Sequence, residues 1–525
     1  MHLPSADFDN AYDDLPYGSN WRSALSPSVF AANPDRAAWN EGNGKHLPRV
    51  VCDLACGSGR QVLQGALLHP DIEFVGVDGS HGHIREANRL KDSLAFTNVE
   101  FICADLMDWS PEAARYDLMT CSGTYPWVPD VVRERILQTF ERGLAADGLA
   151  ILHILSLPAC VGVVDAQRRL LDAVGSAGTI TQRLEAAKAY VAALPPDAPK
   201  TPDASPDSGR NVINNIVRSQ LRQILERNDP GVAHEFLGGP VRADYFRDFA
   251  ATAKRFGLHA VGDANPTVAC DRLIPAGPLR ELFERTRSWH ARQELLDMFA
   301  GTSGGRDVVL ARGPRLAVRS WPGDGRPSLL HARSSGAFDE ASCGPSELHW
   351  HRGDVLAVSR SQAAVWNRIH AAAPESVCIE PRERDDADFL AVHGYAELAV
   401  VPTAIAALHG AAPTTTPLAR AEVSLHLREL SSPLGYHLPN VPAVALVLQL
   451  ADGSIDSAAL AEASRSQWAA RAPADQPLVV DRAAEQAWAQ WWPSERSGKA
   501  ATPPPMDNVD FTRLIGRLAH LGYFN

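Results

Sequence analysis

The 525-residue chain lacks several features that mark specialised classes of protein. No run of 18 apolar residues occurs, so we expect no membrane-spanning helix. The N-terminal residues show no basic segment followed by an apolar one, and we therefore expect no signal peptide. Eight cysteines are scattered, and Cys52 and Cys56 have no second pair at zinc-ribbon spacing. These features predict buried thiols in a reducing compartment, a cytoplasmic location and no bound metal.

An excess of positive charge is also missing. Fifty lysines and arginines oppose 62 aspartates and glutamates, which gives a formal net charge of −12. A nucleic-acid-binding protein needs a basic surface, so this balance argues against nucleic acid as a partner. It still allows a basic peptide or a cationic small molecule. The 45% hydrophobic and 21% charged residues are typical of a globular protein, and the length predicts about three domains.

Strand-like and helix-like segments alternate between residues 49 and 155. The strand-like runs are RVVCDLA, EFVGVDG, VEFICADL, YDLMTCSG and GLAILHIL, and helical periodicity appears in RQVLQGALLHP, HIREANRLKDSL and DVVRERILQTFERGL. This alternation predicts an α/β fold, a Rossmann-like domain with a doubly wound, mostly parallel sheet. We place this domain at residues 1–165.

The rest of the chain divides by composition. Residues 166–313 are largely helical in period, and we expect a helical middle domain there. The Gly/Pro/Ser-rich residues 314–350 indicate a linker, and residues 351–525 indicate an α+β C-terminal domain. His234-Glu235 resembles half of a zinc motif, but position 238 is glycine, so we expect a structural role.

The turn after the first strand reads VVCDLACGSGRQV from Val50 to Val62. Gly57 and Gly59 would let the backbone approach a ligand closely, but the third glycine of a dinucleotide-binding turn is missing, since Val62 stands there. Asp53 precedes the turn, and its carboxylate would repel a pyrophosphate. It would attract a ligand that carries an ammonium and a sulfonium. The turn therefore favours S-adenosyl-L-methionine (SAM) over NAD.

Two further acids end strands of the predicted sheet. Asp78 ends the second strand, at a distance from Gly59 that suits hydrogen bonds to ribose hydroxyls. Asp105 ends the third strand, where a carboxylate can accept from the exocyclic amine of adenine. Three acids at successive strand ends lie where a doubly wound sheet binds its ligand.

This pattern resembles the class I SAM-dependent methyltransferases over residues 45–156. The segments YDDLPYGSN, CSGTYPWVP and NDPGVAHEFLGGPVRADYFRDFAATAKRFGLHAVGDA are similar to methyltransferases that carry a methyltransferase regulatory domain, among them the rickettsial outer-membrane-protein lysine methyltransferases. The chain differs from that group at Asn33-Pro34 and at Pro126. The resemblance implies a dimerisation and regulatory role for 166–313, favours a homodimer, and implies a C-terminal domain that recognises the substrate.

The resemblance and the strand ends together predict the cofactor-binding residues. They are Tyr17, Ser19, Asp53, Ala55, Gly57, Ser58, Gly59, Asp78, Gly79, Ser80, Asp105, Leu106 and Ser122. Tyr125 and Trp127 follow the fourth strand, and aromatic faces there could stabilise the cations of methyl transfer, so we predict them as catalytic residues.

Three functions remain open from the sequence. The first is methyl transfer to a protein or peptide side chain, with a lysine amine as the acceptor that the resemblance implies. The second is methylation of a small molecule or natural product. The third is a non-catalytic SAM-binding subunit that acts through a partner.

Overall fold

The structure is a computed structural model, and its description covers part of the chain. The described residues are 15, 17, 22, 25–27, 30, 47–176, 178–195, 208–225, 227, 229–265, 274, 277–299, 305–313, 329–332, 347–349, 355–357, 359–372, 377–393, 396–399, 415–425, 429–431, 437–439, 442–470, 511, 514, 515 and 518. The predicted site residue Ser19 and the pair Asn33-Pro34 lie outside these ranges. Within them, no helix has the length and apolar character needed to cross a membrane.

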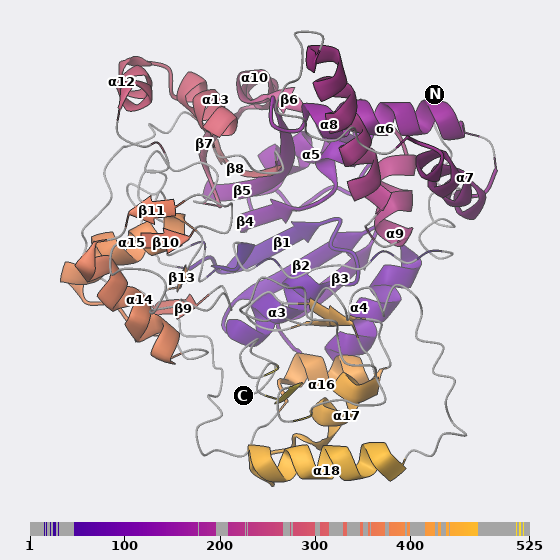
Figure 1. Cartoon of the computed structure of the whole chain (residues 1–525), viewed down its shortest axis with the longest axis vertical. Helices are drawn as coiled ribbons and strands as arrows, with labels where there is room; N and C mark the ends of the chain where they lie inside the picture. The colour runs from indigo at the N-terminus through magenta and orange to yellow at the C-terminus, as the bar shows by residue number, and fades with distance from the viewer. Residues whose placement is uncertain are drawn as a thin grey trace.

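An eight-stranded sheet forms the centre of the molecule (Figure 1), with the order β3-β2-β1-β4-β5-β8-β7 and with β6 paired to the end of β5. The five strands predicted from the sequence are parallel to one another. They are β1 (Val50–Leu54), β2 (Glu73–Asp78), β3 (Val99–Cys103), β4 (Tyr116–Cys121) and β5 (Leu144–Leu157). The helices that connect them are α3 (Arg60–Leu68), α4 (His81–Ser93) and α5 (Asp130–Gly143). The predicted Rossmann-like, doubly wound sheet is confirmed.

Alternating side chains of each strand build one core on each face of the sheet. Val51, Leu118 and Ile151 belong to the cluster that includes α3 and α4. Their strand neighbours Cys52 and Met119 belong to the opposite cluster, which includes α5 and α10 (Phe246–Arg255). Because successive strand residues alternate between faces, polar residues at the strand ends can be assigned to one face or the other.

Two strands of this sheet come from far beyond the predicted end of the first domain. β8 (Gly305–Arg312) is antiparallel to β5 on one side and to β7 (Leu258–Asp263) on the other. The boundary expected at residue 165 is therefore wrong for the sheet, which extends to Arg312. The reason is a long insertion between β5 and β7, whose helical periodicity concealed the two returning strands.

The insertion begins with helices that pack on one another around Leu170, Leu184, Leu221 and Phe236. They are α6 (Val161–Val174), α7 (Ile180–Ala192), α8 (Ser208–Leu225), α9 (Asp229–Gly231) and the π-helix η4 (Val232–Leu237). Figure 1 shows them together at the upper right, beside the sheet. After them follow β6 (Asp244–Tyr245), α10, α12 (Pro278–Arg285) and α13 (Trp289–Phe299).

Apolar faces of the helices in this region bear on the homodimer that the resemblance favours. In α8, Val217 and Leu221 are buried within the chain, whereas Ile216 is exposed. In α12, Phe283 is buried and Leu282 is exposed. Much of these faces is therefore covered inside one chain, and the homodimer stays a prediction.

The C-terminal region is α+β, as predicted from the sequence. One group combines a three-stranded sheet, a two-stranded hairpin and two helices. Its first strands, β9 and β10, lie within the linker predicted at residues 314–350. Its elements are β9 (Leu329–Ala332), β10 (Glu347–His349), β11 (Val355–Ala357), α14 (Arg360–Ala372), β12 (Val377–Cys378), α15 (Arg384–Val392) and β13 (Ala396–Ala399). The second group contains α16 (Pro417–Ser424), β14 (Glu429–Ser431), β15 (His437–Pro439), α17 (Pro442–Leu450) and α18 (Ser457–Ala470).

Helix α16 lies against α4 of the sheet domain (Figure 1). Its Leu418 and Ala421 are buried in the same core as Val62 and Leu63 of α3. Part of the C-terminal region is therefore built into the core beneath the first turn.

Candidate cofactor and active site

The turn between β1 and α3 has an unusual backbone. Ala55, Gly57 and Gly59 all adopt positive φ, at 54°, 55° and 76°. A side chain on Gly59 would also clash, since its Cβ would lie 2.5 Å from the ring of Phe101. Left-handed backbone costs an L-residue about 1–2 kcal/mol, so Ala55 stores strain that the surrounding structure must hold. Such strain is typical of a turn shaped for a ligand.

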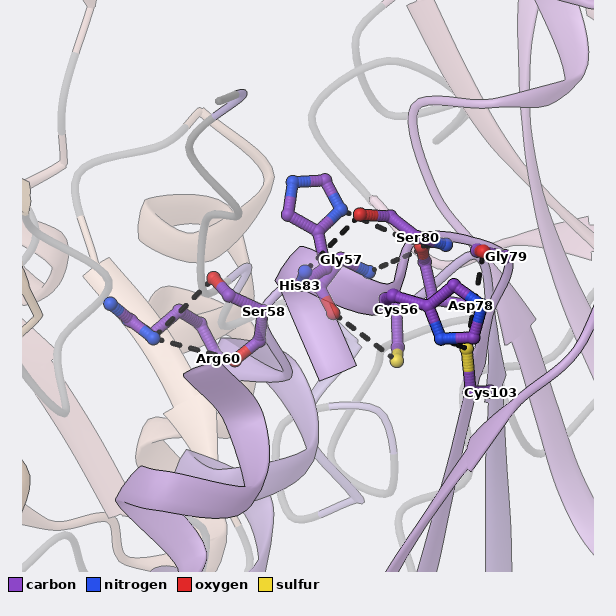
Figure 2. A network of polar contacts seen from close by, with 10 residues as sticks. Cys56, Gly57, Ser58, Arg60, Asp78, Gly79, Ser80, His83 and Cys103 are labelled. Carbon is purple, nitrogen blue, oxygen red and sulfur yellow. Dashed lines mark hydrogen bonds and ion pairs between the residues drawn. The ribbon is translucent and has the colours of Figure 1, made fainter. Parts of the chain in front are cut away.

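Asp78, at the end of β2, fixes this turn (Figure 2). Its Oδ2 accepts from the Gly57 amide at 2.8 Å, and its Oδ1 accepts from the Ser80 amide at 2.9 Å. His83 Nδ1 lies 3.5 Å from Oδ1. Each carboxylate oxygen has two lone pairs, so capacity remains for the two hydroxyls of a ribose. Ser80 also caps α4, because its side chain accepts from the His83 amide.

Asp53 lies on the other side of the turn and is buried. Its Oδ1 accepts from Thr120 Oγ1 of β4 at 2.6 Å. Burial raises the pKa of Asp53 to about 7; the Thr120 hydrogen bond opposes this rise, and the negative charge of Asp78 adds to it. A cationic group placed beside Asp53 would restore its ionised form.

The ends of β2 and β3 come together where adenine was predicted. A Cβ on Gly79 would lie 4.0 Å from Asp105 Cα. Asp105 is exposed, and its Oδ1 accepts from the Met107 amide at 2.8 Å. Leu106 beside it is half-buried. The predicted residues at these strand ends are therefore neighbours on one edge of the sheet.

Tyr17 is held by the π-helix of the insertion. Its hydroxyl donates to Glu235, and its ring meets His234 edge-on with centroids 6.0 Å apart. His234 Nε2 in turn donates to the carbonyl of Leu15 at 2.6 Å. His234-Glu235 thus ties the N-terminal segment to η4, which is a structural role. That Tyr17 covers the cofactor remains a prediction.

Tyr125 is buried against the helix α10. The segment after β4 winds into a 3₁₀ turn, η3 (Tyr125–Trp127), and this turn buries Tyr125 edge-on against Phe249 of α10 at 5.9 Å. The sequence did not predict this packing of α10 on Tyr125, and the catalytic role of Tyr125 remains a prediction. Trp127 is half-buried and packs against Phe236 at 5.4 Å. Its catalytic role remains a prediction.

Three residues that the sequence analysis missed lie at the same edge. Arg22 donates to Ser122 Oγ at 2.8 Å and to Asp307 Oδ2 at 2.6 Å. Asp307 is buried at the start of β8 and pairs across the strands with His153 of β5. These partners are far apart along the chain, so no local motif could have revealed them.

His153 is uncharged at neutral pH. Burial lowers its pKa to about 4; Asp307 opposes this shift, and Arg22 adds to it. Its Nδ1 is buried and makes no hydrogen bond to any residue that the structure describes. His153 lies on the same sheet face as Asp53 and Thr120, since Ile151 and Val51 share one core. A neutral imidazole at this place can accept a hydrogen bond from an incoming amine.

Metal ligands do not gather at this edge. Among the residues that the structure describes, no group of three or more His, Cys, Asp or Glu side chains could hold a metal ion.

Comparison with known proteins identifies the class of protein to which this domain belongs. A family model described as a methyltransferase domain matches residues 51–148. This segment contains the strained turn, Asp53, Asp78 and Asp105. It is a class I methyltransferase domain, and its cofactor is S-adenosyl-L-methionine.

Longer matches extend the likeness beyond this domain. PKMT2 from Rickettsia typhi in complex with AdoHcy superposes with a TM-score of 0.68 at 16% identity, over 97% of this chain and 100% of PKMT2. This likeness shows a common fold. An uncharacterized Rickettsia prowazekii protein, RP789, is 25% identical over 265 residues, which are 49% of this chain and 44% of that protein.

A third relative has an activity in its name. The trans-aconitate 2-methyltransferase of Methylobacterium radiotolerans is 30% identical over 131 residues, which are 25% of this chain and 45% of that enzyme. The chain thus matches less than half the length of RP789 and of this enzyme.

The raised pKa of Asp53 predicts a pH-dependent affinity for S-adenosylhomocysteine (AdoHcy). We expect the ligand's ammonium to favour ionised Asp53, so below pH 7 binding must first expel a proton. Affinity should therefore rise with pH up to about 7, by at most roughly tenfold per pH unit. Calorimetry in buffers of different ionisation enthalpy would measure the released proton. The Asp53→Asn variant should bind AdoHcy more weakly, and its affinity should no longer rise with pH. If its affinity still rose with pH as in the wild type, the released proton would belong to another group.

Proposed function

We propose that the chain transfers the methyl group of SAM to a side-chain amine of a protein or peptide, with lysine as the acceptor. The observation that carries this proposal is the fold shared with PKMT2 along 97% of the chain, the C-terminal region included. The sequence resemblance to rickettsial lysine methyltransferases supports the same acceptor. The sheet ends at Arg312, and the 213 residues that follow it are more than a small acceptor requires.

The residues at the sheet edge suit this reaction. Bound SAM supplies a sulfonium methyl group, which the lone pair of an uncharged amine displaces from sulfur, leaving AdoHcy. Asp53 and Asp78 would hold the methionine part and the ribose of the cofactor, and such alignment can contribute about 7–11 kcal/mol to lowering the barrier. An amine that leaves water for this edge has a lowered pKa, so it can lose its proton without a strong base. His153 would then accept a hydrogen bond from the amine and orient its lone pair.

A second candidate is methylation of a small molecule. The trans-aconitate 2-methyltransferase match favours it, but it covers only a quarter of the chain. The methyl-transfer test described next distinguishes small-molecule methylation from lysine methylation and from a non-catalytic SAM-binding subunit.

The test is transfer from SAM with a labelled methyl group. The full-length chain is added to a lysate of the source organism, and macromolecules are separated from small molecules. We expect acid-stable label in protein, released as methyl-lysine after hydrolysis. The control is Asp78→Ala, which should abolish transfer because it removes the anchor of the turn. Label in the small-molecule fraction would favour the second candidate. Binding of AdoHcy without any transfer would identify a binding subunit.

A further inference from the structure

We propose that Arg22 binds the carboxylate of the methionine part of the cofactor and that Asp307 positions the Arg22 guanidinium for this contact. The proposal rests on the cofactor of the proposed function and does not depend on the acceptor. It assigns a specificity-determining role to two residues that belong to none of the sequence motifs of the site.

The backbone of Arg22 is attached to the helix that follows the glycine turn. The Arg22 amide donates to Gln61 Oε1 at 2.8 Å, and Gln61 Nε2 donates back to the Arg22 carbonyl at 3.3 Å. Gln61 is the second residue of α3, and Gly59 immediately precedes that helix. These two bonds fix Arg22 beside the turn that receives the cofactor.

The side chain of Arg22 keeps donors for a ligand. A guanidinium has five N–H groups, and those on Nη1 and Nη2 supply one hydrogen bond each, to Ser122 and to Asp307. The three other N–H groups have no partner among the residues that the structure describes. The side chain is 34% exposed, whereas that of Asp307 is 2% exposed. The buried carboxylate therefore fixes the orientation of a guanidinium that can still bind a second carboxylate.

The charges along this edge match a bound amino acid. Ser122, which accepts from Arg22, lies two residues beyond Thr120, which donates to Asp53. An anion and a cation thus stand on either side of the end of β4. The free amino acid end of the cofactor carries an ammonium and a carboxylate, and Asp53 and Arg22 are the complementary pair.

Arg60 is a neighbouring arginine, but two glutamates already compensate its charge. Although it is the first residue of α3, its side chain is buried and paired with Glu86 and Glu422. Figure 2 shows Arg60 on the opposite side of the turn from Asp78. Of these two arginines, Arg22 is therefore the one that faces the end of β4 and the start of β8.

The test compares two ligands that differ only in the carboxylate. AdoHcy and 5′-deoxy-5′-(3-aminopropylthio)adenosine are titrated calorimetrically into the full-length chain. Hydrogen bonds to charged groups contribute about 1.5–3 kcal/mol, so wild type should prefer AdoHcy by roughly 10- to 100-fold. Arg22→Met should lose this preference through weaker AdoHcy binding, while its affinity for the analogue stays within about twofold of wild type.

Two further variants separate direct binding from positioning. Arg22→Lys keeps the charge without the planar fork and should retain part of the preference. Asp307→Asn should also reduce the preference, with the analogue unaffected, because it removes the charge that orients Arg22. The matched control is Arg49→Met, an exposed arginine just before β1 at the opposite edge of the sheet, which should change neither affinity.

Three results would overturn the proposal. Equal weakening of both ligands in the Arg22 variants would show that Arg22 only supports the fold. Unchanged selectivity would show that it does not touch the carboxylate. A wild-type chain that binds neither ligand would overturn the cofactor assignment and this proposal together. Failure of methyl transfer to protein, with the ligand preference intact, would remove only the proposed acceptor.

Discussion

A chain that ends at residue 165 is expected to lose cooperative unfolding and to bind no AdoHcy. It keeps the turn, Asp53 and Asp78, but it lacks β7 and β8. Residues 308–311 of β8 are fully buried against β5 and β7. Each buried aliphatic side chain contributes about 1.5–3 kcal/mol, and a domain has only about 5–15 kcal/mol of stability in total. Their removal would also leave β5 as an unpaired apolar edge.

The measurement is urea unfolding followed by circular dichroism, together with AdoHcy calorimetry. The informative comparison is a chain that ends at residue 313, which restores β7 and β8 but lacks α16. That chain should regain a cooperative transition and remain less stable than the full-length protein. If the 165-residue chain unfolded cooperatively and bound AdoHcy as the full chain does, the last two strands would be dispensable for the site.

Glu422→Ala is expected to destabilise the protein by about 3–5 kcal/mol and to weaken AdoHcy binding. Glu422 Oε1 lies 2.7 Å from Arg60 Nε, and the two side chains are 0% and 5% exposed. Loss of one partner leaves a buried charge undercompensated. Arg60 follows the glycine turn directly, and its Nη1 lies 3.4 Å from the carbonyl and hydroxyl oxygens of Ser58. A displaced Arg60 would therefore disturb the turn.

A double-mutant cycle tests the coupling. Arg60→Met combined with Glu422→Leu replaces the ion pair with apolar side chains and should cost much less than Glu422→Ala alone. Glu86→Ala is the matched control, because Glu86 also pairs with Arg60 but is 35% exposed, and it should cost at most about 1 kcal/mol. Additive effects of the two substitutions would show that Arg60 and Glu422 contribute independently.

The position of helix α16 changes the role expected for the C-terminal region. The sequence suggested a separate substrate-recognition domain over 351–525. Through Glu422, Leu418 and Ala421, helix α16 instead completes the core beneath the cofactor turn. Substrate recognition by the remainder of that region stays a proposal.

The sequence by itself determined the first half of the sheet and three acids of the site. Five apolar runs predicted β1 to β5, because strand and helix periodicities are local and repeat within a few residues. Asp53, Asp78 and Asp105 were found because parallel strands bring their carboxyl ends to one edge, so a strand-end position fixes a place in space. Gly57 and Gly59 were found because a turn whose backbone approaches a ligand closely favours glycine.

Only the tertiary structure decided which distant residues complete that edge. β8 reaches β5 across more than a hundred residues, and Arg22 reaches Asp307 from the other end of the domain. Tyr125 turns into the core because α10 packs over it, and Glu422 neutralises Arg60 from the C-terminal region. Such pairs have no periodicity and no fixed spacing. They are selected by packing and by the need to compensate each buried charge, which operate only once the whole chain has folded.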